Sequence, residues 1–202
     1  LAATHRDANR KTSKEQDMKA TTELRHEHDA VLVALRILDK VAAAVAQNDA
    51  RAPGDLERLL DFFRVFVDKC HHGKEEDVLF PELERRGVRR EGGPVGVMLA
   101  EHEVGRGHVR AMAENLQKVR AGDSAAAAAI TEHAAAYRAM LQMHIQKENN
   151  VLFPMAERVV PAEVAERIAG QFDAIEQERV GEGKHEAYHA MLRETKDRYG
   201  VE

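Results

Sequence analysis

Two stretches of the chain share a pattern of histidine, lysine and glutamate whose side chains could bind metal ions. Residues 71–81 and 144–154 both read His-x-x-Lys-Glu-x-x-Val-Leu-Phe-Pro, and the second copy is displaced by 73 residues. A shorter pair, Glu27-His28, recurs as Glu101-His102 with a displacement of 74 residues. This internal repeat indicates that two helical hairpins of the same design follow one another. Imidazole and carboxylate donors without thiolate favour iron or manganese over a structural zinc site.

The spacing directs these side chains toward the interior of a helical bundle. Residues four apart share a helix face, so His71 lies with Glu75, and His144 lies with Glu148. Burying ionised carboxylates costs several kcal/mol each, and a pair of cations would remove that cost. The candidate metal ligands are His28, His71, Glu75, His102, His144 and Glu148. Two shared carboxylates could bridge two ions, with positions left for an oxygen bridge and an exogenous molecule. The alternative is that these are hydrogen-bonded core residues left by an ordinary gene duplication.

Four further residues are candidates for a position next to the ligands. Glu27 and Glu101 each precede a candidate histidine and would either hydrogen-bond near the site or lie exposed on the helix surface. Tyr137 lies two turns before His144 and could donate a hydrogen bond or only pack in the core. His72 is turned about 100° from His71 around an α-helix. We therefore expect it to face solvent or to support a ligand rather than to bind metal.

The apolar positions predict an all-α fold. They recur at three- and four-residue steps from about residue 18 to residue 47, which marks one face of a long amphipathic helix. Further helices are expected from an N-cap at Asp55, from Pro94 to Arg120, from residue 124 to about Arg158, from Pro161, and around 184–199. We predict a polar arm over 1–17, an up-down-up-down four-helix bundle over 18–160, and C-terminal helices over 161–202 packed on it.

Composition excludes several classes of protein. The net charge is −5 and acidic and basic residues are interspersed, whereas nucleic-acid binding needs a basic stripe. Cys70 is the single cysteine, so no disulfide can form within the chain. No apolar run approaches the ~20 residues that span a bilayer. The sequence therefore predicts a cytoplasmic protein that binds neither nucleic acid nor membrane, and it identifies no protein partner.

These motifs resemble those of the hemerythrin-like family, also called HHE cation-binding domains. The matching pieces are Glu27-His28, residues 71–76, Glu101-His102 and residues 144–148. The resemblance implies a non-haem di-iron centre, oxo- or hydroxo-bridged, in which Glu75 and Glu148 bridge two iron ions and the four candidate histidines are terminal ligands. The oxygen-carrying members have a second histidine four residues after the one on the third helix. Here that position is Arg106, which weakens the case for simple reversible oxygen carriage.

Three functions are compatible with such a centre. The first is binding of dioxygen, nitric oxide or peroxide for sensing, storage or detoxification, with Gly105 leaving room for access beside His102. The second is an enzyme that turns over peroxide or nitric oxide, acts as an oxidase, or repairs damaged iron centres. Turnover would need a nearby proton source, for which Glu27, Glu101 and Tyr137 are the candidates. The third is a protein of iron homeostasis that uses its last two helices as a partner surface.

Overall fold

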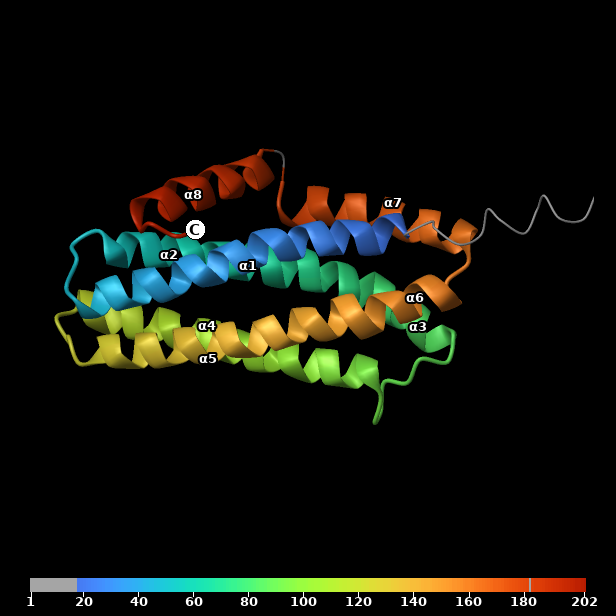
Figure 1. Cartoon of the computed structure of the whole chain (residues 1–202), viewed down its shortest axis with the longest axis horizontal. Coiled ribbons are helices and arrows are strands. Elements are labelled where there is room, and N and C mark those ends of the chain that lie inside the picture. The colour runs from blue at the N-terminus through green and yellow to red at the C-terminus, as the bar shows by residue number, and fades with distance from the viewer. Residues whose placement is uncertain (1–17, 182) are drawn as a thin grey trace, which may run out of the picture.

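The chain folds into a bundle of long helices (Figure 1). This computed structural model describes residues 18–181 and 183–202, so the predicted arm over 1–17 lies outside it. Those described residues contain no strand, which confirms the all-α prediction. The helical elements are α1 Lys19–Ala46, α2 Ala52–Phe62, η1 Phe63–His72, η2 Glu75–Leu79, α3 Phe80–Arg85, α4 Pro94–Arg120, α5 Ala126–Lys147, η3 Glu148–Leu152, α6 Phe153–Val159, α7 Ala162–Arg179 and α8 Lys184–Arg198. Within the same residues, every helix is too short or too polar to cross a bilayer.

One predicted helix start is wrong. Asp55 was expected to cap the second helix, but α2 begins three residues earlier at Ala52, with Pro53 in its first turn. Proline is tolerated there because the first turn has no intrahelical partner for its missing N–H. The buried Asp55 carboxylate instead accepts hydrogen bonds of 2.6 and 2.7 Å from the Arg198 guanidinium and one of 3.0 Å from the Tyr199 hydroxyl. Asp55 thus connects the end of α8 to the start of α2.

The two copies of the repeat share an irregular backbone. In each copy a π-helical stretch begins at the glutamate, as η2 at Glu75 and η3 at Glu148. Each stretch ends one residue before a helix whose second position is proline, Pro81 or Pro154. Proline cannot donate to a carbonyl in the preceding turn, and a wider turn accommodates that missing bond. Because π turns are wider than α turns, they change which side chains face the interior.

The apolar core consists of two clusters with the candidate ligands between them. One cluster contains residues from 30 to 45 of α1, and the other contains Met18, Ala20 and Leu24. His28 therefore separates the two clusters along the first helix. The same separation occurs at 71–75, at His102 and near 144–148. Along α1 and α4 the chain passes from the cluster that contains Met18 to the other cluster, and along the segments that contain 71–75 and 144–148 it passes in the opposite direction. A polar layer consequently crosses the bundle at one level.

The last two helices contribute to both clusters. They lie along one side of α1 and α2 (Figure 1). Phe172 of α7 is fully buried in one cluster, and Tyr188 of α8 is buried in the other. At the level of the polar layer, Arg179 donates a hydrogen bond of 3.1 Å to the carbonyl of Lys69. A Cβ atom on Gly73 would lie 2.2 Å from the Arg179 guanidinium, so glycine permits this close approach.

Because Phe172 is completely enclosed, Phe172→Ala should lower the free energy of unfolding by about 3–5 kcal/mol through lost burial and the cavity left behind. Gln171→Ala is the matched control, since Gln171 is exposed on the same helix and should change stability by less than about 0.5 kcal/mol. Urea unfolding followed by circular dichroism measures both. Equal stability of the two variants would contradict the packing of α7 on the bundle.

Candidate metal centre

Four buried histidines meet in the polar layer as two pairs. The Nε2 atoms of His28 and His71 lie 3.1 Å apart, and those of His102 and His144 also lie 3.1 Å apart. All four side chains are at most 3 % exposed. Each pair joins the two arms of one hairpin of the repeat, α1 with η1 in one half and α4 with α5 in the other.

Two glutamates connect the histidine pairs. Glu148 places Oε2 3.1 Å from Nε2 of His28 and Oε1 3.1 Å from Nε2 of His144. Glu75 places Oε2 3.4 Å from Nε2 of His102 and Oε1 3.8 Å from Nε2 of His71. Both carboxylates are fully buried. Each therefore turns one oxygen toward each histidine pair, which is the arrangement of a bridging ligand.

The donor atoms form two overlapping groups that could each hold a cation. His28, His71, Glu75 and Glu148 offer ligand atoms within 4.8 Å of one another. Glu75, His102, His144 and Glu148 form the second group with the same limit, so the glutamates belong to both. The six candidate ligands predicted from the sequence are thus brought together around two neighbouring positions.

Uncompensated charge in this layer fits the presence of cations. The four carboxylate oxygens of Glu75 and Glu148 accept no hydrogen bond, although they are buried. Burial raises the pKa of Glu75 well above its usual range, and the charge of Glu148 raises it further. Burial also acts to raise the pKa of Glu148, but the nearby charges of His144 and His28 hold it well below its usual range. A metal ion bound to both carboxylates would satisfy oxygens that the protein leaves without partners.

Comparison with known proteins agrees with this geometry. The hemerythrin HHE cation-binding domain matches residues 19–156, which include all six candidate ligands. The chain belongs to this family. An uncharacterized protein of Mycobacterium bovis is 27 % identical over 174 residues, covering 85 % of this chain and 67 % of the relative. An uncharacterized protein of Mycobacterium tuberculosis matches with the same identity and coverage. The HHE domain and the two clusters together identify a chain built to bind cations.

In this HHE domain, two histidines are oriented by matching glutamate–lysine pairs. His71 donates from Nδ1 to Glu27 over 2.7 Å, and Lys74 donates to the other oxygen of Glu27 over 2.5 Å. In the second copy, His144 donates from Nδ1 to Glu101 over 2.8 Å. Lys147 pairs with the remaining oxygen of Glu101. Because Nδ1 of each imidazole donates outward, Nε2 is the atom directed at the centre, which is how supporting groups orient metal-binding histidines.

The other two histidines are oriented by another matching pair of positions. His102 donates from Nδ1 to Glu76 over 2.6 Å, and His28 donates to the amide oxygen of Asn149 over 3.0 Å. Glu76 and Asn149 occupy equivalent places in the two copies, one residue after the candidate bridging glutamates. With Nδ1–H donated outward on both members, the Nε2 atoms of each histidine pair face each other over 3.1 Å. A cation beside them could bind both nitrogens.

No role was predicted from the sequence for the two orienting lysines, Lys74 and Lys147. Lys74 and Lys147 are identical in the repeat, and this identity was the available signal. Sequence periodicity alone does not reveal that Glu76 is half-buried beside His102. Its pKa is lowered because hydrogen bonds from His102 and Arg106 outweigh the effect of burial. Glu27 and Glu101 lie at the site rather than on an open helix surface.

His72 lies in the interior, so of the two positions expected for it the solvent-facing one is wrong. It is 5 % exposed, and its ring stacks on His102 with centroids 3.7 Å apart. The reason is the π-helical stretch η1, which ends at His72 and places successive residues closer together around the axis than an α-helix does. Tyr137 is also buried and packs edge-on against Phe63.

The repeat provides a matched test of the buried ion pairs. Lys74 is fully buried and contacts Glu23, Glu27 and Glu176, whereas the side chain of Lys147 is 37 % exposed. Lys74→Met should lower the free energy of unfolding by about 3–5 kcal/mol because Glu27 loses its cationic partner in the interior. Lys147→Met should lower it by less than about 1 kcal/mol. Urea unfolding of the metal-free protein measures both, and similar losses would contradict the difference in burial.

Proposed function

We propose that this chain is a non-haem di-iron protein that binds a small ligand at a carboxylate-bridged dinuclear site. The ligand would be dioxygen, nitric oxide or peroxide, and the role would be sensing, storage or detoxification. The observation that carries the proposal is the position of Glu75 and Glu148, each of which turns one oxygen toward each histidine pair. Two ions rather than one explain why both carboxylates are shared.

The donor chemistry supports iron. Each half offers two imidazole nitrogens and two carboxylate oxygens, and Cys70 belongs to neither group. Nitrogen and oxygen donors with positions left open are typical of non-haem iron sites. Two adjacent iron ions would supply electrons as a pair to a bound ligand. The protein's own contribution is to orient the imidazoles through Glu27, Glu101, Glu76 and Asn149 and to keep bulk water out of the layer.

The arrangement of the helices also supports a dinuclear metal site. Four successive long segments carry the candidate ligands, and each passes through both apolar clusters. The order in which a segment passes through the two clusters reverses from one segment to the next. We infer from this alternation that neighbouring segments run in opposite directions, as in an up-down-up-down four-helix bundle. Such bundles place inward-facing histidines and glutamates from all four helices around a dinuclear centre. A cytoplasmic location stays a prediction from the sequence.

Mixing the anaerobic ferrous protein with dioxygen, nitric oxide or hydrogen peroxide tests the ligand. At least one of the three should produce new charge-transfer absorption in the visible region, because an exogenous ligand can reach an open position. The metal-free protein treated in the same way is the control. An iron-loaded protein whose spectrum stays unchanged with all three ligands would contradict the proposal.

Removing either bridge should reduce metal binding. Glu75→Ala and Glu148→Ala each delete a carboxylate shared by both positions, so iron content should fall below about half of the wild-type value. His133→Ala is the control because His133 pairs with His108 outside both ligand groups. Elemental analysis of protein purified without added metal gives the occupancy. If all three variants kept the wild-type iron content, these carboxylates would not be ligands.

A further inference from the structure

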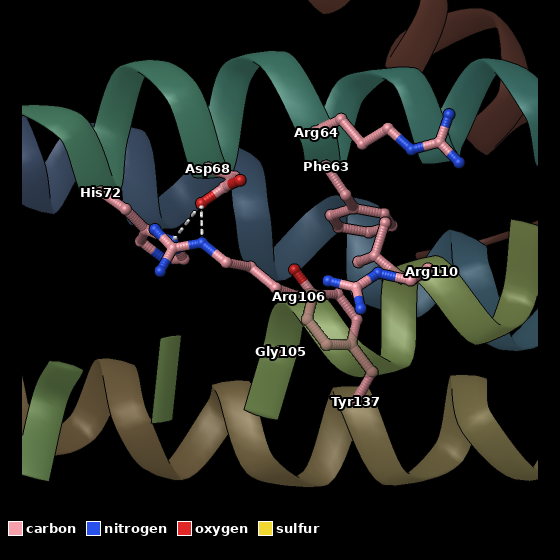
Figure 2. A pocket seen from close by; sticks show the side chains of 9 residues that line it. Phe63, Arg64, Asp68, His72, Gly105, Arg106, Arg110 and Tyr137 are labelled. Atoms are coloured by element: carbon pink, nitrogen blue, oxygen red, sulfur yellow. Dashed lines mark hydrogen bonds and ion pairs between the residues drawn. The ribbon is translucent and has the colours of Figure 1, made fainter. Parts of the chain in front are cut away.

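A pocket of about 230 Å³ opens beside one half of the centre. It lies between η1 and α4, with Tyr137 of α5 reaching into it (Figure 2). Its lining includes His72, Gly105, Arg106 and Tyr137, but none of the six candidate ligands. A water molecule in the liquid takes up about 30 Å³, so a ligand of two to four atoms has ample room. The pocket reaches the centre only through His72, which stacks on His102.

His72 connects the pocket to the centre. It lines the pocket, and it also offers a ring nitrogen within 4.8 Å of ligand atoms on His102 and His144. The interplanar angle between His72 and His102 is only 12°. Imidazole lone pairs lie in the ring plane, so two nearly parallel stacked rings cannot both direct a nitrogen at one ion about 2.1 Å away. His72 is consequently placed to contact a ligand of the metal rather than the metal itself.

The inner end of the pocket has hydrogen-bonding groups without partners. Both ring nitrogens of His72 are buried and make no hydrogen bond; Nδ1 lies 3.5 Å from Asp68. A neutral imidazole offers one donor and one acceptor, and neither nitrogen of His72 has a partner among the described residues. The hydroxyl of Tyr137 points from α5 toward η1 (Figure 2). Buried ring nitrogens of this kind are normally satisfied, and a polar molecule in the pocket would satisfy those of His72.

Two other features keep the pocket open and polar. A Cβ atom on Gly105 would lie 3.3 Å from a ring carbon of Tyr137 and 3.2 Å from Met140, so glycine makes room for the tyrosine. The Arg106 guanidinium is drawn to the wall by Asp68 at 2.7 Å and Glu76 at 2.8 Å. Arg64 and Arg110 line the exposed side. Such a mouth suits a polar ligand better than an apolar gas.

We propose that this pocket admits hydrogen peroxide to the His102–His144 half of the centre, where His72 and Tyr137 hydrogen-bond it. The inference rests on the proposed dinuclear site and selects among its three candidate ligands. Peroxide carries O–H groups that an unprotonated ring nitrogen of His72 accepts, and oxygens to which the Tyr137 hydroxyl donates. Dioxygen and nitric oxide carry no hydrogen and leave the His72 acceptor without a partner.

Ligand binding to the ferric, metal-loaded protein tests this assignment. His72→Phe keeps a ring to stack on His102 and removes both nitrogens, whereas Tyr137→Phe removes a single oxygen atom. Each should raise the half-saturating peroxide concentration about tenfold, the effect of losing one hydrogen bond. Rapid-mixing absorption measures it. Tyr188→Phe is the matched control, because the Tyr188 hydroxyl binds Asp61 away from the pocket, and it should bind peroxide like the wild type.

Azide is a second probe because it has no hydrogen to donate to His72. Its binding should therefore be weakened less by His72→Phe than peroxide binding is. Elemental analysis of each variant separates this inference from the proposed function. Loss of iron in His72→Phe would show that His72 is a metal ligand and would overturn its role here. Unchanged peroxide binding in both His72→Phe and Tyr137→Phe, with full iron content, would overturn the pocket assignment and leave the dinuclear site standing.

Discussion

Two carboxylates buried without hydrogen-bond partners are the constraint on which the rest of this structure depends. Glu75 and Glu148 are completely enclosed, and their four oxygens face imidazole nitrogens rather than water or backbone donors. Such groups are tolerated in an interior only when opposite charge is close by. The apolar clusters above and below, the outward hydrogen bonds of the histidines and the widened helical turns all serve to hold this layer in place.

The internal duplication explains why the layer is nearly symmetric. Each copy supplies one histidine from its first helix and a histidine, lysine and glutamate from its second. The orienting groups are duplicated too, since Glu27 with Lys74 corresponds to Glu101 with Lys147. In this HHE domain, each hairpin thus supplies one half of the site, and the two halves together could hold two cations. Duplication reproduces the surrounding hydrogen bonds together with the candidate ligands.

The symmetry is broken in two places. In the first half, α7 covers Lys74, and Glu176 approaches it at 3.2 Å, so that lysine is fully buried. In the second half, the equivalent Lys147 stays partly exposed. His72 has Ile145 as its counterpart, and only the side with histidine borders the pocket next to His102. The two halves are therefore alike in their candidate ligands but differ in the residues around them and in their contacts with the C-terminal helices.

The sequence by itself determined the helical class, the repeat and the six side chains that meet, because periodicity and spacing decide which residues share a helix face. Only the tertiary structure decided which histidines pair, because His28 meets His71 across helices and no local pattern specifies a partner. It also decided the burial of His72 and Lys74. His72 turns inward because η1 is π-helical, and Lys74 is enclosed because α7 folds back over it. Both depend on packing between distant segments, which residue spacing does not encode.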